Sequence, residues 1–161
     1  DGRQSLYISN DEGASARFGV AQNVQYAYRD LKLPKGIYEV SFDWACLGSA
    51  DAMLYAGVGP AANISLTANN KNAVIPNNVM SWCKTLGKMN GSSLWKISSI
   101  NLNSNGTTVY RLFFVWSSSN RDSTIAMPMG ACVDNVQICS ANCAKPKNIQ
   151  ATSTCDSIMV T

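Results

Sequence analysis

Residues 37–46, from Ile37 to Cys46, have the sequence IYEVSFDWAC, in which apolar and polar side chains alternate. Successive side chains of an extended strand point to opposite faces, so every second residue lies on the same face. One face would carry Tyr38, Val40, Phe42 and Trp44, and the other would carry Glu39, Ser41 and Asp43. This pattern predicts a half-buried β-strand whose apolar face covers a core.

Strand patterns also dominate on both sides of this stretch, whereas helical periodicity is nearly absent. The segment Pro34-Lys35-Gly36 directly before it has the residue types of a tight reversal. In residues 109–116 both faces are largely apolar, which is typical of a central strand. The other predicted strands cover residues 5–9, 24–33, 53–58, 94–102 and 132–139. Strands joined by turns, with no helix of note, predict an all-β fold, an antiparallel β-sandwich.

Composition sets the broad class of protein. The chain has 161 residues, of which 46% are hydrophobic, so it can bury a core and most of it is expected to be ordered. The net charge is +3, and the lysines and arginines stand singly along the chain. A nucleic-acid-binding surface needs a basic stripe, so no nucleic-acid partner is expected. No apolar run approaches the length of a membrane span or signal peptide, and no membrane insertion is expected.

Six cysteines, an even number, occur in a chain rich in Asn, Ser and Thr. This use of cysteine favours an oxidising compartment outside the cytoplasm, where disulfides persist. A zinc site is not expected, because the sequence has no Cys-x-x-Cys pair and no histidine. Three arrangements stay open: a bridge between Cys143 and Cys155, a local pair of Cys139 and Cys143, or buried thiols that act as small apolar side chains.

The residues that catalysis usually needs are scarce. Without histidine, neither a Ser-His nor a Cys-His nucleophile pair is possible. A glycosidase needs two carboxylates that face each other across a sugar. The glutamates are Glu12, in a predicted turn, and Glu39, on the polar face of a strand, and the aspartates are scattered over separate segments. We therefore expect a protein that is not an enzyme.

Four segments, taken together, resemble a known family. They are SLYISNDEGA (5–14), YAYRDLKLPKGIYEVSFDW (26–44), VYRLFFVW (109–116) and CVDNVQIC (132–139). They are similar to jelly-roll modules of secreted, multimodular Bacteroidetes proteins, which are related to cleaved-adhesin and MAM-like domains and share their sandwich with many carbohydrate-binding modules. The resemblance covers roughly residues 5–139 and implies an antiparallel jelly-roll β-sandwich. Such modules serve adhesion, glycan binding or spacing, so the fold alone does not choose among these functions.

The end of the chain resembles a different domain. Residues 143–161, CAKPKNIQATSTCDSIMVT, have a Pro-marked entry and two short apolar runs, similar to the first two strands of a fibronectin type III domain. Such a domain commonly follows this kind of jelly roll. The resemblance therefore implies a jelly-roll module at residues 1–142, truncated fibronectin type III-like strands at residues 143–161, and further domains of the same polypeptide. In that family an additional edge strand also precedes the segment at residues 5–9.

The resemblance also implies a metal ion. Jelly rolls of this kind often hold a structural Ca²⁺, with an aspartate of the last strand among its ligands, and Asp134 is the matching position. Calcium takes about six to eight oxygen ligands, so Asp134 and nearby carbonyl groups would supply part of the shell. The alternative is that Asp134 is an ordinary strand residue hydrogen-bonded to a loop.

Glycan binding would need an exposed aromatic ring and polar side chains that bind hydroxyl groups. Trp82 lies in a weakly patterned, Asn-rich stretch, and Trp116 ends a predicted strand next to a polar loop. Either ring could stack on a sugar, with Arg121 and Asp122 as hydrogen-bonding partners. The alternative is that both rings pack internally. Trp95 falls on an apolar strand face and is expected in the core.

From these patterns we expect a non-catalytic β-sandwich module of a secreted or surface-attached bacterial protein that acts in cell adhesion. Its partners would be host or polysaccharide glycans or another surface protein. The alternative is a carbohydrate-binding module that stacks a glycan on Trp82 or Trp116. An exposed tryptophan flanked by Arg or Asp in a groove favours glycan binding, whereas a flat surface with packed tryptophans favours adhesion or spacing.

Overall fold

The computed structural model describes residues 5–9, 12–16, 18, 22–47, 52–66, 81–82, 89–118, 130–141, 151–154 and 157–160 of the chain. Most of these residues are in β-strands, and the remainder form turns, a short 3₁₀ turn and short extended stretches. For residues 81–82, 151–154 and 157–160 the backbone alone is described.

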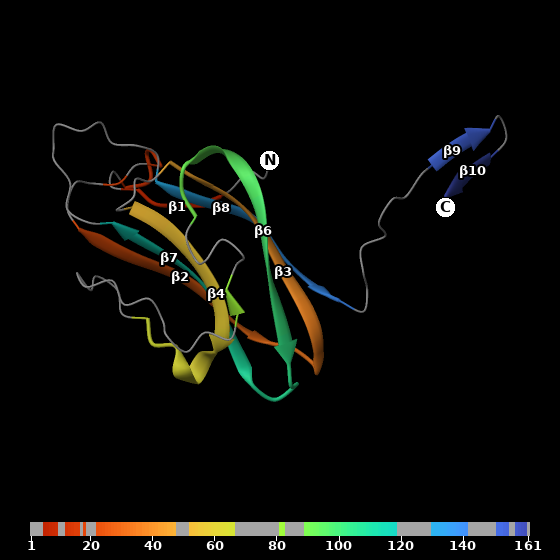
Figure 1. Cartoon of the computed structure of the whole chain (residues 1–161), viewed down its shortest axis with the longest axis horizontal. Coiled ribbons are helices and arrows are strands. Elements are labelled where there is room, and N and C mark those ends of the chain that lie inside the picture. The colour runs from red at the N-terminus through yellow and green to blue at the C-terminus, as the bar shows by residue number, and fades with distance from the viewer. Residues whose placement is uncertain are drawn as a thin grey trace.

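Two antiparallel sheets of four strands each pack face to face (Figure 1). The first sheet has the strand order β1 (Leu6–Tyr7), β8 (Ala131–Ser140), β3 (Gly36–Cys46) and β6 (Ser92–Ser104). The second sheet has the order β2 (Asn23–Lys32), β7 (Val109–Ser118), β4 (Ala52–Pro60) and β5 (Ser81–Trp82). The prediction of an all-β, antiparallel sandwich is confirmed, and β7 is the central strand that its apolar pattern predicts.

The strand connectivity is that of a jelly roll. The first strand pairs with the eighth, the second with the seventh, the third with the sixth and the fourth with the fifth. This nested pairing arises when one long hairpin folds over on itself, and the additional pairs β3–β8 and β4–β7 complete the two sheets. As a consequence, β1 and β2 lie on one side of the sandwich, and β5 and β6 lie on the other.

The core lies between the sheets and follows the alternation of the sequence. Phe42 and Trp44 of β3 are buried, and Phe42 meets Phe114 of β7 edge to face, with ring centroids 5.0 Å apart. Trp116 of β7 packs in the same way on Phe18, with centroids 4.7 Å apart. Such aromatic pairs add about 0.5–1.5 kcal/mol to the free energy gained by burying the rings.

A second apolar cluster covers the outer face of the second sheet. It consists of Val24, Ile64, Phe113 and Val115, with Tyr26, Tyr55 and Leu66 packed around them. Ile64 reaches the sheet because the 3₁₀ turn η1 (Ala61–Asn63) leads the chain back over β7. Burial raises the pKa of both Tyr26 and Tyr55. At this end, therefore, the second sheet is covered on both faces.

The turn between β6 and β7 requires glycine. Gly106 has a φ of +85°, and a Cβ at this position would lie 2.9 Å from the backbone nitrogen of Lys35. Asn105 Oδ1 accepts hydrogen bonds from the backbone N–H groups of Thr107 and Thr108, both at 2.9 Å. These contacts shape the β6–β7 turn and seat it against the turn between β2 and β3.

Two further segments, residues 81–82 and the end of the chain, differ in how well the sequence predicted their secondary structure. Trp82 was expected outside a strand, but Ser81 and Trp82 form β5, because their backbones pair with β4. Near the chain end, β9 (Ala151–Thr154) and β10 (Ser157–Val160) form an antiparallel hairpin. The second predicted apolar run lies in β10, whereas β9 begins at Ala151, the last residue of the first run, and continues into the stretch that was interpreted as a polar turn. Assignment of this hairpin to a fibronectin type III domain stays a prediction. Within the described ranges, no helix is long and apolar enough to cross a membrane.

Candidate functional site: the open-side groove

In the part of the chain that the structure describes, one side of the sandwich is incompletely closed by paired strands. β1 has two residues and pairs with β8 at Cys132 and Val133, whereas β8 has ten residues. On the same side, β2 is the outer strand of the second sheet and, among the described strands, pairs with β7 alone. The inner faces of both sheets are therefore accessible between β1 and β8 on one wall and β2 on the other. We call this depression the open-side groove.

The open-side groove consists of two adjoining cavities that share Leu6, Ala27 and Phe114. Their volumes are about 360 Å³ and 500 Å³. The first is lined by Leu6, Tyr7, Ile8, Ser9, Gln25, Tyr26, Ala27, Leu54, Phe114, Trp116, Ala131 and Val133, and the second by Leu6, Ala27, Tyr28, Arg29, Leu31, Leu112, Phe114, Val136 and Ile138. Ligand sites in proteins typically measure about 300–1,000 Å³, so each cavity has a suitable size.

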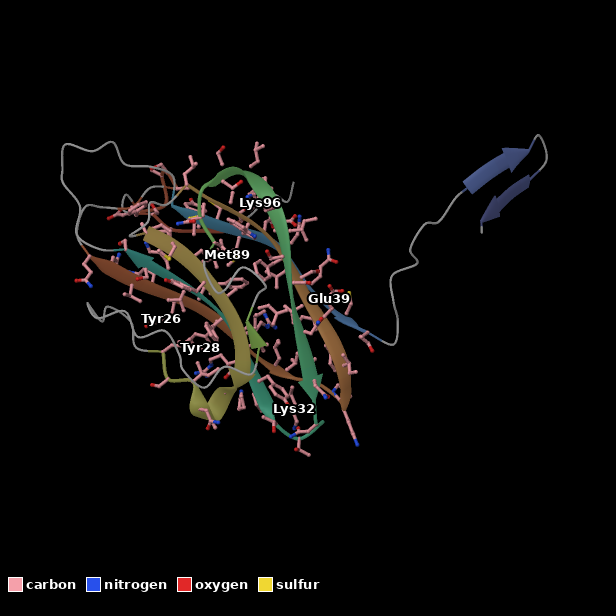
Figure 2. The ribbon with its side chains drawn as sticks, viewed as in Figure 1. Tyr26, Tyr28, Lys32, Glu39, Met89 and Lys96 are labelled. Atoms are coloured by element: carbon pink, nitrogen blue, oxygen red, sulfur yellow. The ribbon has the colours of Figure 1, made fainter. Side chains whose placement is uncertain are left out.

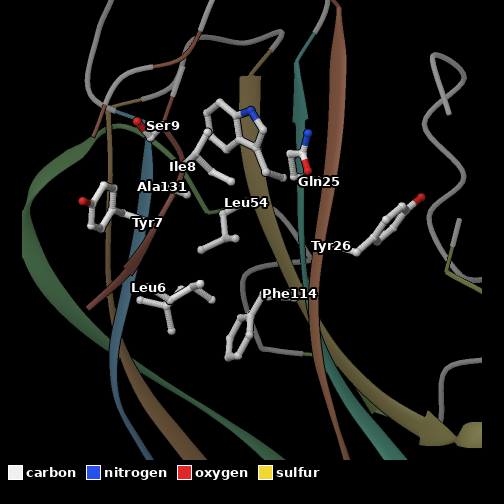
Figure 3. A pocket seen from close by; sticks show the side chains of 12 residues that line it. Leu6, Tyr7, Ile8, Ser9, Gln25, Tyr26, Leu54, Phe114 and Ala131 are labelled. Carbon is white, nitrogen blue, oxygen red and sulfur yellow. The ribbon is translucent and has the colours of Figure 1, made fainter. Parts of the chain in front are cut away.

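The first cavity has an apolar interior and a polar mouth. Figure 3 shows Leu6 on one side of the cavity, and Leu54 and Phe114 on the other. Tyr26 points away from the cavity, toward the outer face of its sheet (Figure 3). The amide of Gln25 lies at the mouth, where its Nε2 donates a hydrogen bond to Asn23 Oδ1 at 3.0 Å. The cavity can therefore take an apolar group and orient it with a few polar contacts.

Apolar side chains remain uncovered along the groove. Leu6 is 50% exposed and Val136 is 46% exposed, although both line the space between the sheets. Val40, an inner-facing residue in the middle of the first sheet, is fully buried. Among the described residues, β1 covers only the first part of β8, and none of them pairs with β8 beside Val136, whereas Val40 has paired strands on both sides. Clustered exposed apolar surface of this kind is typical of binding sites.

Tyr28, labelled in Figure 2, lies on β2 among the residues that line the second cavity. An ion pair of Arg111 and Asp30 lies next to its ring. The guanidinium of Arg111 lies 4.3 Å from the centre of the Tyr28 ring. Arg111 donates to both carboxylate oxygens of Asp30, at 2.7 and 2.8 Å, and to the Ile64 carbonyl at 2.8 Å. The hydrogen bond from Arg111 lowers the pKa of Asp30. Tyr28 has the parity of Tyr26, so its ring, which is 56% exposed, is on the outer face of β2, where Arg111 positions it beside the groove.

Asp134, the predicted calcium ligand, lies on the outer face of the first sheet, away from the groove lining. Its cross-strand neighbour is Asp43 of β3. Asp134 accepts hydrogen bonds from Ser5 Oγ at 3.1 Å and from the backbone N–H of Asn135 at 2.7 Å. The side-chain amide of Asn135 donates to Asp43 at 2.7 Å. Asn135 lies where the β3–β8 register shifts and has a φ of +49°, a conformation that lets it bridge the two carboxylates.

These residues fit a calcium ion in part. Two carboxylates opposite each other repel, and a cation would offset that repulsion. Calcium needs about six to eight oxygen ligands, however, and Asp43 and Asp134 already accept hydrogen bonds from Asn135. Within the described part of the chain, no group of three or more His, Cys, Asp or Glu residues could hold a metal ion. The remaining ligands of a calcium ion would therefore have to be carbonyl groups, water or residues outside this part.

Among the residues predicted to bind a glycan, Trp116 is the one whose side chain the structure describes. Trp116 is 1% exposed, because it belongs to the core face of β7, so its ring offers no platform for a sugar. The backbone of Trp82 is in β5, and its side chain lies outside the described residues. Arg121 and Asp122 also lie outside them. Of the two alternatives for Trp116, the structure therefore has the one in which the ring packs internally.

Trp95 is the candidate that the sequence interpretation missed. It was expected in the core but is 48% exposed on β6. Ile100 and Leu102 of the same strand are buried, and Trp95 and Ile97 are an odd number of positions away from them, on the opposite face. The alternation in the second half of β6 indicates that Trp95 is on the outer face. The apolar run at the start of the strand has no such alternation and therefore gave the wrong interpretation.

The described cysteines bear on the predicted disulfides. Cys132 and Cys139 of β8 carry free thiols, and burial raises the pKa of Cys132. The alternative in which Cys139 pairs with Cys143 is therefore absent from this structure. Cys143 and Cys155 lie outside the described residues, so a bridge between them stays a prediction.

A comparison with known protein families finds no family model that matches this chain, and a comparison with curated proteins finds no match. The function is therefore argued from the groove and its residues.

Proposed function

We propose that this protein is a non-catalytic binding module of a secreted or surface-attached bacterial protein, and that it acts in cell adhesion through the open-side groove. The observation that carries the proposal is the uncovered apolar interior of the groove. Leu6, Val136 and Ile138 line it and are 50%, 46% and 36% exposed. A ligand that covers these side chains would remove apolar surface from water, which is the main driving force of most association.

Covering the apolar side chains of the groove would supply part of the free energy of binding. Burial of apolar surface contributes about 25 cal/mol per Å², so covering the exposed half of one aliphatic side chain contributes about 1 kcal/mol. Tyr28, Arg29 and Gln25 at the rim add an aromatic ring and hydrogen-bonding groups that would orient a ligand. The chain has no histidine, the commonest general base, which favours binding over turnover.

Blocking the groove tests the proposal. In Ala27→Arg a long charged side chain stands where the two cavities meet. Beads coated with this variant should attach to host cells and immobilised polysaccharides about tenfold less than wild-type beads, a loss of about 1.4 kcal/mol. The control is Asn101→Arg, which adds the same charge at an exposed position of β6, outside the groove.

Two outcomes would count against the proposal. Equal attachment of the Ala27→Arg variant and the wild type, with matched melting temperatures, would separate adhesion from the groove. Wild-type beads that attach to no surface of the panel would argue against adhesion altogether.

A second candidate function, glycan recognition, is supported by the exposure of Trp95 rather than by Trp82 or Trp116. An exposed indole face can stack on the C–H face of a sugar. If so, intrinsic fluorescence should shift when a host or plant polysaccharide is added, and Trp95→Ala should remove the shift. A shift that persists in Trp95→Ala would instead direct attention to Trp82 or to the groove.

We also propose a structural calcium ion at Asp134, with Asp43 as the second carboxylate. The support is the cross-strand pairing of the two side chains on one face of the sheet. Such an ion would tie β8 to β3 next to the residue at which their register shifts, and its expected effect on stability is treated in the Discussion.

A further inference from the structure

Trp116, on the core face of β7, has an indole N–H group without a hydrogen-bond partner. Its Nε1 is buried, and no atom of the described residues accepts a hydrogen bond from it. Trp44 of β3 is buried in the same core, but its Nε1 donates to Ser98 Oγ at 2.9 Å. Buried indole N–H groups in proteins usually have such a partner, so the unpaired donor of Trp116 calls for an explanation.

The side chains next to Trp116 do not supply the partner. Phe18 meets Trp116 edge to face, with ring centroids 4.7 Å apart, but an aromatic ring is a weak acceptor in comparison with a carbonyl oxygen. The cross-strand neighbours of Trp116 are Gln25 of β2 and Leu54 of β4, and neither accepts a hydrogen bond from it. An acceptor for this donor would therefore come from the space beside the ring.

That space is the first cavity of the open-side groove, which Trp116 lines. Gln25 and Leu54 line the same cavity (Figure 3). Its volume is about 360 Å³. An engineered apolar cavity of about 150 Å³ holds a benzene molecule, so this one has room for a ring with a substituent. None of the described residues that line it is charged, so it favours a neutral group.

We propose that the ligand of the first cavity is a neutral molecule with an apolar body and a carbonyl oxygen that accepts a hydrogen bond from Trp116 Nε1. This inference rests on the proposed function, since it names the chemistry of the ligand that the groove would bind. The apolar body would cover Leu6, Leu54 and Phe114. Nε1 itself is covered, so the side chain of Gln25, which lies at the mouth, would move aside as the oxygen enters.

Such a site selects its ligand by hydrogen bonding as well as by shape. A buried donor disfavours a ligand of the same shape that lacks the acceptor, because the donor then stays unpaired. A carboxylate would bring a charge into a cavity whose described lining has no cation to pair with it. Neutral ketones, esters and amides therefore fit the first cavity better than hydrocarbons or carboxylates do.

Two probe molecules of the same shape test the inference, since acetophenone has a carbonyl oxygen where α-methylstyrene has a methylene group. Trp116→Phe keeps an aromatic ring but removes the donor. It should weaken the binding of acetophenone about tenfold, a loss of about 1.4 kcal/mol, and change the binding of α-methylstyrene less than about twofold. Trp44→Phe is the matched control, because it shortens a buried tryptophan whose donor is already paired, and it should leave both affinities unchanged.

A second measurement does not depend on how well Trp116→Phe folds. In an NMR titration of the isotope-labelled wild type, one indole N–H signal should move downfield with acetophenone and should not do so with α-methylstyrene. Ala27→Arg, which blocks the groove, should abolish this shift.

The inference is overturned by equal binding of acetophenone to the wild type and to Trp116→Phe. It is also overturned if neither probe binds, since water alone would then satisfy the donor. Both results are distinguishable from failure of the proposed function, because the bead attachment of the wild type and of Ala27→Arg measures the role of the groove without either probe.

Discussion

The two outer edges of the first sheet expose apolar side chains in different ways. At the β8 edge, Val136 and Ile138 face the space between the sheets and line a groove about 500 Å³ in volume. At the β6 edge, Trp95 and Ile97 are on the outer face, and Leu94 has the opposite parity on the same edge. The first edge is a hollow between two sheets, whereas the second is a bare strand.

The two edges therefore differ in what they could enclose. A hollow lined by side chains from both sheets can enclose a side chain or sugar ring, and its shape selects a ligand. Leu94, Trp95 and Ile97 of β6 line neither cavity of the groove. The short β1 causes the first feature, and the composition of β6 causes the second.

The largest expected effect comes from removing the floor of the groove. Phe114→Ala should lower the free energy of unfolding by about 3–5 kcal/mol, because the ring is 8% exposed and packs on Phe42. Ile97→Ala, at the bare edge, should change it by less than about 0.5 kcal/mol. Urea denaturation of both variants measures the difference. If both variants lost a similar free energy of unfolding, Ile97 would contribute to the core as much as Phe114 does.

A smaller effect is expected at the register shift of β8. Asn135→Ala should destabilise the protein by about 1–3 kcal/mol, because it removes the bridge between Asp43 and Asp134 and places alanine at positive φ. Asn135→Gly keeps the backbone relaxed and isolates the contribution of the lost side-chain amide. If both variants have the melting temperature of the wild type, the contacts of Asn135 with Asp43 and Asp134 do not stabilise the pairing of β8 with β3.

Calcium removal should have an effect of similar or smaller size. A chelator should lower the melting temperature by a few degrees, since an ion that binds the folded state alone stabilises it by roughly 1–3 kcal/mol near saturation. Asp134→Ala should melt at the same temperature with and without the chelator. Identical melting of the wild type in both conditions would exclude the site.

The smallest effect is expected at the rim of the groove. Asp30→Asn should cost about 0.2–1 kcal/mol at neutral pH, because the pair with Arg111 is partly exposed. The pKa of Asp30 is lower in the folded state, so this stability is present above the unfolded pKa of about 4 and is lost as the pH falls through the folded value. Melting curves of the variant and the wild type should therefore converge in acid. If the difference in melting temperature between the variant and the wild type stayed constant down to the lowest pH, it would not arise from the ion pair of Asp30 with Arg111.

The sequence predicted the fold better than the site. Alternation in residues 37–46 identified β3 and its buried face, because a central strand is specified by its own side chains. β5 escaped prediction since its two residues are held in a strand by pairing with β4 rather than by a pattern of their own.

The groove was not predictable from the sequence for a related reason. It depends on the difference in length between β1 and β8 and on residues brought together from separate strands. Trp95 was expected in the core but is exposed, and Trp116 was left open between exposure and internal packing, because strand propensity does not say which face a chain position takes. The parity relative to Leu102 in β6 and to Phe114 in β7 carried that information.

The most direct test of the assignment of the two edges uses one substitution of the same kind at each. Bead attachment is measured for Val136→Lys and Ile97→Lys alongside the wild type. Val136→Lys should reduce attachment about tenfold, since it places a charge in the groove, while Ile97→Lys should attach as the wild type does. Full attachment by Val136→Lys, together with loss of attachment in Ile97→Lys, would contradict the assignment of the groove as the binding site.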